Sequence, residues 1–164
     1  MGAGKTTVGK MLARRMGLSF IDLDSYIESR HLRTVGQLFD EKGENAFRQI
    51  ERNLLREVAE FEDVLVSTGG GTPCFYDNME FINRCGRSVY LKVSVEELLD
   101  RLEVCKHSRP LLRNKTRDEL RLFIAETLQK REPFYTQASV LFDAERMSSD
   151  TDVQTIVEAL EKIL

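Results

Sequence analysis

The feature that most constrains this chain is its amino terminus, where Gly-Ala-Gly-Lys-Thr-Thr follows Met1 and runs directly into a helical pattern. Small residues let backbone N–H groups turn inward, and the following helix directs the positive end of its dipole at the same place. The segment is the end of the phosphate-binding pattern Gly-x-x-x-x-Gly-Lys-[Ser/Thr]. We therefore expect a bound polyphosphate, with Lys5 reaching its β- and γ-phosphates and the Thr6 hydroxyl facing Mg²⁺.

Two other interpretations of the amino terminus stay open. Gly2 and Thr6 formally satisfy the myristoylation pattern, in which Gly2 is exposed after removal of Met1. The first 21 residues also contain no acidic residue, which superficially resembles an organellar transit peptide. The phosphate-loop interpretation gains weight only if the rest of the chain supplies the parts of a kinase.

Composition excludes several other classes of protein. The 164 residues carry 24 Lys and Arg against 27 Asp and Glu, a net charge of −3 that lacks the footprint of nucleic-acid binding. No apolar run approaches the roughly 18 residues of a membrane span. Three cysteines at least 11 residues apart and two histidines lack zinc-ligand spacing. These counts predict a single cytoplasmic domain, residues 1–164, without a nucleic-acid or membrane partner.

Hydrophobic periodicity divides the chain into alternating helices and strands. We expect strands at 18–23, 64–67, 88–93 and 140–142. We expect helices at 6–16, 25–30, 35–60 with an interruption near Lys42 and Gly43, 77–84, 95–102, 116–131 and 150–164. Strands separated by helices form a parallel sheet covered on both faces, so the fold class is α/β.

Two carboxylates, Asp22 and Asp24, lie at the carboxyl end of the strand expected at 18–23. Residues two apart on a strand face the same side, and open parallel sheets bind ligands beyond their strand ends. One carboxylate can support a metal ion while the other orients or deprotonates an attacking hydroxyl. The alternative is structural, with Asp24 as a helix cap and Asp22 as a surface charge.

Arg48 and Glu51 lie three residues apart in the long helical stretch, at the spacing of an ion pair. A guanidinium held by Glu51 would be pre-organised to bind a substrate carboxylate bidentately, provided that a second cation assists. The alternative is a local surface pair. Phe39 and Phe47 could form the apolar wall of a small ring, although their helical spacing also suits core residues.

Three consecutive glycines, Gly69, Gly70 and Gly71, follow the strand expected at 64–67. Glycine costs backbone entropy on folding, so a shorter or stiffer turn would serve better if turning were the only requirement. Close approach of a ligand explains the run, because unhindered N–H groups at Gly70 and Gly71 could donate to substrate hydroxyls. A plain turn is the alternative.

Taken in order, these motifs resemble the shikimate kinase family of P-loop kinases. The resemblance extends from Gly2 to about Tyr135 through Gly-Ala-Gly-Lys-Thr-Thr, Asp-Leu-Asp, Phe-Arg-Gln-Ile-Glu, Gly-Gly-Gly, Arg-Pro-Leu-Leu and Lys-Arg-Glu-Pro-Phe-Tyr. It implies a three-layer α/β/α fold with a short parallel sheet, five-stranded in the family. It also implies a monomer that uses ATP and Mg²⁺ to phosphorylate the 3-hydroxyl of shikimate, on the route to chorismate and the aromatic amino acids.

The same resemblance assigns roles to individual residues. The catalytic residues would be Lys5, Asp24 and Arg109. The nucleotide would be bound by Gly2, Ala3, Gly4, Lys5, Thr6, Thr7 and Arg109, and the substrate by Asp24, Arg48, Gly69, Gly70, Gly71 and Arg131. Mg²⁺ would lie near Thr6 and Asp22, with Asp22 acting through water. Residues 103–115 would form a mobile lid that carries Arg109, and residues 25–60 would form the substrate-binding helical region.

One part of the family pattern is unmatched. The first Gly of the full loop pattern would lie five positions before Gly4, two residues upstream of Met1, and the family's first strand precedes it. We therefore expect that strand to be missing from the sequence through a late start or a truncation, with Met1 an internal methionine. Two alternatives follow: another small-molecule kinase, such as a gluconate-kinase-like enzyme, or a non-catalytic nucleotide-binding module if the strand is truly absent.

Overall fold

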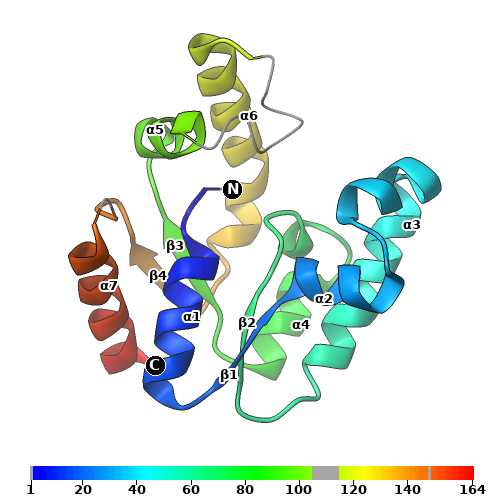
Figure 1. Cartoon of the computed structure of the whole chain (residues 1–164), viewed down its shortest axis with the longest axis horizontal. Helices are drawn as coiled ribbons and strands as arrows, with labels where there is room; N and C mark the ends of the chain where they lie inside the picture. The colour runs from blue at the N-terminus through cyan, green and yellow to red at the C-terminus, as the bar shows by residue number, and fades with distance from the viewer. Residues whose placement is uncertain (1, 105–114, 148) are drawn as a thin grey trace.

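The computed structural model describes residues 2–104, 115–147 and 149–164. Short strands alternate with helices along these ranges, which confirms a helix-rich α/β fold (Figure 1). The strands are β1 (Ser19–Asp22), β2 (Val64–Ser67), β3 (Val89–Lys92) and β4 (Val140–Asp143). The helices are α1 (Lys5–Met16), α2 (Leu23–His31), α3 (Val35–Val58), α4 (Asn78–Cys85), α5 (Val95–Val104), α6 (Arg117–Tyr135) and α7 (Asp150–Ile163), with a 3₁₀ turn, η1 (Thr72–Cys74).

The strands are parallel, but they form two separate pairs. β1 pairs with β2, and Asp22 at the end of β1 lies opposite Ser67 at the end of β2. β3 pairs with β4 in the same parallel sense. No pairing joins β2 to β3 within the described ranges, so the single sheet predicted by the alternation of elements is divided in two.

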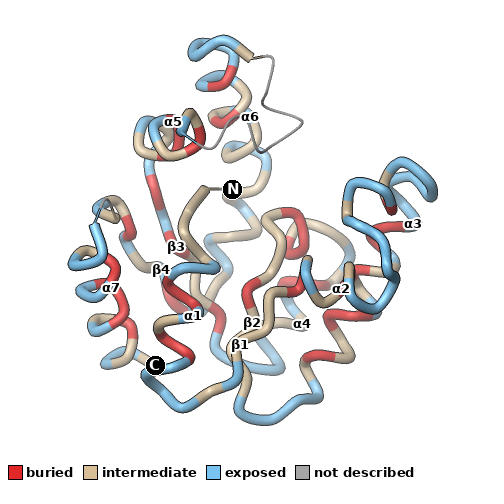
Figure 2. Tube along the Cα trace, in the orientation of Figure 1, coloured by how far each residue is buried: buried red, intermediate tan, exposed pale blue. Residues whose placement is uncertain are grey.

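Two hydrophobic cores hold the fold, one beside each pair of strands. The first lies among α1, α5, α6, α7 and β3 and includes Leu12, Leu99 and Leu160. The second lies mainly between α2 and α3 and includes Leu23 and Phe47. Helix α1 contacts β1, β2 and α7, so it joins the two halves. Figure 2 shows buried residues along α1 and α7, whereas the first half of α3 is mostly exposed.

Local sequence signals set several helix boundaries as predicted. Gly17 ends α1 in the left-handed conformation, with a φ of 71°. Gly43, with a φ of 78°, interrupts α3 where the sequence predicts a break. Capping boxes satisfy the first N–H groups of three helices. The N-cap residues that form these boxes are Thr34 in α3, Thr116 in α6 and Ser149 in α7.

The packing of α1 on the first strand pair depends on a residue without a side chain. A Cβ at Gly9 would lie 2.7 Å from Phe20 Cε2 and 3.2 Å from Leu65 Cδ2. We expect Gly9→Ala to lower the free energy of unfolding by about 1–3 kcal/mol, although Ala normally favours a helix interior, because the methyl group overpacks this contact. Urea denaturation measures the change. Gly36→Ala is the control, because its Cβ would make an ordinary 3.8 Å contact with Thr34 Oγ1; equal losses in both variants would contradict the prediction.

Candidate active site

The glycine-rich loop and the start of α1 form one side of the site. Gly4 caps α1 with a φ of 80°, and the helix begins at Lys5. The Thr6 hydroxyl donates to Asp22 Oδ2 at 3.0 Å, which joins the start of α1 to the end of β1. Lys5 interacts electrostatically with Asp24. The predicted phosphate-binding residues therefore lie beside both predicted carboxylates.

Asp22 and Asp24 lie together, although not as two residues of one strand. β1 ends at Asp22, whose Oδ1 accepts a hydrogen bond from Ser25 N–H at 3.3 Å and so caps α2. Asp24 lies in the first turn of that helix, which corrects both the expected strand pair and the alternative that Asp24 is the cap. Burial raises the pKa of Asp24, the charges of Asp22 and Glu51 raise it further, and Lys5 lowers it. A carboxylate with a raised pKa is a better acceptor for a substrate proton.

Arg48 is held in a buried ion pair. Its Nη1 donates to Glu51 Oε2 at 2.8 Å, and its Nη2 donates to Glu44 Oε1 at 3.4 Å. Arg48 is only 9% exposed and Glu51 only 1%, so the predicted pair exists and is buried rather than on the surface. Arg48 Nε is buried without a hydrogen-bond partner among the described residues.

Three aromatic rings surround the Arg48 guanidinium. Cζ lies 4.1 Å from the centre of the Phe75 ring, 5.3 Å from that of Phe47 and 5.4 Å from that of Phe39. Phe47 is a core residue at 1% exposure, and Phe39 packs on it with ring centres 4.3 Å apart. The core role is therefore confirmed for Phe47, whereas a role of either ring against a substrate stays a prediction. Phe75 was not predicted, because no local spacing links it to Arg48.

The glycine run passes between the charged groups of the site. A Cβ at Gly69 would lie 2.9 Å from Asp24 Oδ1, and a Cβ at Gly71 would lie 2.7 Å from Arg48 Nη2. A side chain at either position would therefore displace the Asp24 carboxylate or the Arg48 guanidinium, a constraint that a plain turn would not impose. The adjacent Thr72 is also fully buried and donates to Glu51 Oε1 at 2.7 Å, a link that the sequence did not predict.

Helix α6 supplies the second cation. Burial raises the pKa of the Cys74 thiol in η1, and the charges of Arg131 and Arg48 lower it in part. One turn after Arg131, the Tyr135 hydroxyl donates to the Gly70 carbonyl oxygen at 2.5 Å. Arg48 and Arg131, which the family resemblance assigns to one substrate, thus both act electrostatically on Cys74. Arg109 and most of the expected lid, residues 105–114, lie outside the described residues.

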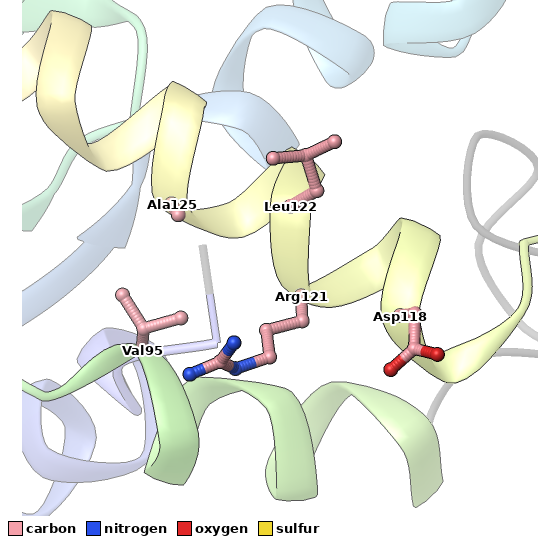
Figure 3. A pocket seen from close by; sticks show the side chains of 5 residues that line it. All are labelled: Val95, Asp118, Arg121, Leu122 and Ala125. Atoms are coloured by element: carbon pink, nitrogen blue, oxygen red, sulfur yellow. The ribbon is translucent and has the colours of Figure 1, made fainter.

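Two hollows lie in the surface of the described residues, and one of them is lined by predicted site residues. One of about 430 Å³ runs along α1, and its lining includes the predicted nucleotide-binding residues Thr6 and Thr7. Another of about 410 Å³ lies between α5 and α6 (Figure 3). It contains no residue that the sequence assigned to the site. Its lining residues are Val95, Asp118, Arg121, Leu122 and Ala125.

The residues present fit a magnesium ion that shares its ligands with a nucleotide. In the described part of the chain, no cluster of three or more His, Cys, Asp or Glu side chains could hold a metal alone. Thr6 directs its proton to Asp22, so the lone pairs of its oxygen are available to a cation. Mg²⁺ usually keeps several waters and takes substrate phosphates as ligands.

None of the described helices is long and apolar enough to cross a membrane.

Comparison with known proteins points to one family. The sequence matches the family model described as shikimate kinase over residues 1–161. It is 67% identical to a shikimate kinase of Parabacteroides distasonis over 164 residues, all of this chain and 95% of that protein. The fold matches the crystal structure of shikimate kinase from Bacteroides thetaiotaomicron with a TM-score of 0.96 and 53% identity, covering 99% of this chain and 93% of that one. Shikimate kinase from Acinetobacter baumannii in complex with shikimate matches with a TM-score of 0.84 and 32% identity, covering 99% and 88%.

The raised pKa of Asp24 predicts a stability effect with a definite sign. A carboxyl with a raised folded-state pKa holds its proton longer in the folded than in the unfolded chain, so stability falls as pH rises from its ordinary value of 3.8 through the raised one. We expect Asp24→Asn to melt increasingly above the wild type as pH rises from about 4 to 7. Thermal unfolding of both proteins across this range measures the difference. A difference that shrinks with rising pH would contradict the assignment.

Proposed function

Because the chain belongs to the shikimate kinase family, we propose that it transfers the γ-phosphate of ATP to the 3-hydroxyl of shikimate. The observation that carries this proposal is the buried, aromatic-lined Arg48, whose Nε has no hydrogen-bond partner among the described residues, together with Asp24 and Arg131 nearby. Such a site suits a small carboxylic acid with a hydroxyl to be deprotonated. The relative from Acinetobacter baumannii, which matches nearly the whole chain, is a complex with shikimate.

In this proposal, the two arginines and the glycine loop bind the substrate. Arg48 and Arg131 bind the shikimate carboxylate, and hydrogen bonds to charged groups contribute about 1.5–3 kcal/mol each. Glu51 holds Arg48 in place from the opposite side, so little side-chain entropy is lost when substrate binds. The N–H groups of Gly70 and Gly71 donate to ring hydroxyls. Orientation by these groups presents the 3-hydroxyl to Asp24.

Phosphate transfer uses the residues at the start of α1 and the end of β1. Asp24 accepts the proton of the 3-hydroxyl on its carboxylate as the oxygen attacks the γ-phosphorus and ADP leaves. Lys5 and the N–H groups of Gly2, Ala3 and Gly4, with Thr6 and Thr7, bind the phosphates. Thr6 and, through water, Asp22 would hold Mg²⁺, which neutralises phosphate charge when bound. Arg109 is proposed to stabilise the transferring phosphate. A monomer and a cytoplasmic location stay predictions.

A coupled ADP-release assay tests the reaction. We expect turnover with MgATP and shikimate, and none with MgATP and gluconate or a nucleoside monophosphate. Turnover with gluconate alone would replace the substrate assignment with that of a gluconate-kinase-like enzyme. Calorimetry covers the remaining alternative, because a nucleotide-binding module would take up ATP without turning over any of these acceptors.

Two substitutions should separate binding from chemistry. Arg48→Ala removes a carboxylate contact, so we expect the KM for shikimate to rise about 10- to 100-fold with a smaller effect on kcat. Asp24→Asn removes the proton acceptor, so we expect kcat to fall about 10²- to 10⁴-fold. Steady-state kinetics measures both. Arg56→Ala is the control, because Arg56 also lies on α3 but pairs with Asp77 at 2.9 Å outside the site. Unchanged kinetics in either test variant would remove that residue from the site.

A further inference from the structure

Thr72 begins the 3₁₀ turn η1, directly after the glycine run, and lies against the carboxylate that holds Arg48. It is fully buried, and its hydroxyl donates to Glu51 Oε1 at 2.7 Å. The other oxygen of the same carboxylate, Oε2, accepts from Arg48 Nη1 at 2.8 Å. Glu51 therefore connects a buried hydroxyl to a cation of the candidate site.

The position of Arg48 depends mainly on Glu51. The other carboxylate in contact, that of Glu44, lies 3.4 Å from Nη2 on a side chain that is 56% exposed, so solvent weakens its hold. The last torsion of a glutamate side chain has a broad energy well, so one partner alone does not fix the plane of the Glu51 carboxylate. A second hydrogen bond at Oε1 fixes that plane, and with it the direction from which Oε2 meets Arg48.

The protein holds Thr72 itself in one conformation. Its N–H donates to the Gly69 carbonyl oxygen at 3.1 Å, and its own carbonyl oxygen accepts from Asn78 Nδ2 at 2.9 Å. Asn78 is fully buried as well. Threonine is β-branched and therefore stiff at its first side-chain torsion. Because the backbone is held on both sides of the residue, the Thr72 hydroxyl has a fixed direction toward Glu51.

Nothing in the solvent can replace this hydroxyl. Glu51 is only 1% exposed, so removal of the donor would leave Oε1 buried without its hydrogen bond. The carboxylate would then rotate to share Oε1 with another donor, and the Arg48 guanidinium is already in contact with it. The guanidinium would turn with the carboxylate and present a different edge to an incoming anion.

We propose that Thr72 is a positioning residue for shikimate, whose hydroxyl fixes the Glu51 carboxylate and, through it, the Arg48 guanidinium that binds the substrate carboxylate. The inference rests on the proposed function, in which Arg48 makes that contact. Thr72 acts through Glu51 and Arg48 and has no direct role in the chemistry.

Thr72→Val tests the proposal, because it removes the hydroxyl and keeps the branched shape of the side chain. We expect the KM for shikimate to rise about 3- to 10-fold, with kcat and the KM for ATP changed less than about 2-fold. The rise is smaller than for Arg48→Ala because the guanidinium itself remains. A lower melting temperature of Thr72→Val with an unchanged KM for shikimate would show a purely structural role and overturn the proposal.

Thr72→Ser restores the hydroxyl without the methyl group. Its KM for shikimate should stay within about 2-fold of the wild type, although loss of the buried methyl group lowers its melting temperature. Ser88→Ala is the matched control, because Ser88 is also buried and its partners in the described structure, Asn83 and Ser139, lie outside the site. A KM for shikimate raised as much in Thr72→Ser or Ser88→Ala as in Thr72→Val would assign the effect to lost stability and contradict the proposal.

A further measurement uses the wild-type protein and does not depend on a variant that folds. Arg48 Nε has no hydrogen-bond partner among the described residues, so its N–H reports the surroundings of the guanidinium directly. In ¹H–¹⁵N spectra of the substrate-free wild type, we expect one sharp Arg48 Nε–H resonance, because the guanidinium occupies one position. The resonance should broaden or split in Thr72→Val and stay sharp in Thr72→Ser. A broadened resonance in the substrate-free wild type would overturn the proposal.

Arg48→Ala separates a failure of this inference from a failure of the proposed function. If Arg48→Ala raises the KM for shikimate and Thr72→Val does not, only the role of Thr72 is wrong. If neither variant changes the KM, the substrate site itself is misassigned.

Discussion

The site depends on one buried carboxylate, Glu51. Its two oxygens accept hydrogen bonds from Arg48 and Thr72, and its charge contributes to the raised pKa of Asp24. Removing one partner of a buried ion pair typically costs about 3–5 kcal/mol, because the remaining charge is left uncompensated. Glu51 therefore holds the substrate-binding cation, the end of the glycine run and the protonation of Asp24 in one arrangement.

The strand register explains why these groups meet. β1 and β2 run parallel, with Asp22 opposite Ser67, so the residues that follow each strand emerge at the same edge. Asp24 and Gly69 each lie two residues beyond those partners and are consequently close, since a Cβ at Gly69 would be 2.9 Å from Asp24 Oδ1. Ligands of parallel sheets bind at this edge because helix starts and loop N–H groups converge there. The separation of β2 from β3 leaves this edge intact, because α1 contacts both β1 and β2 and joins the two cores.

Features set by neighbours in sequence were predictable. Arg48 and Glu51 are three residues apart on a helix, so their pairing follows from helical geometry. The break at Gly43 likewise follows from local chemistry. Asp22 and Asp24 were harder, because either carboxylate can cap the helix that follows them, and only the position at which β1 ends selects Asp22. Division of the strands into two pairs depends on contacts between distant segments, which alternation of elements does not specify.

By itself, the sequence determined the order of elements, the phosphate-binding loop and the chemical types available for a carboxylate and a hydroxyl. Tertiary structure decided which of them meet: Phe75 against Arg48, Thr72 on Glu51, and Tyr135 on the Gly70 carbonyl. The physical reason is the separation along the chain over which each effect acts. Helix periodicity and capping act over three or four residues and can be read from spacing, whereas burial, pKa shifts and hydrogen bonds between distant segments arise only when packing removes water from around them.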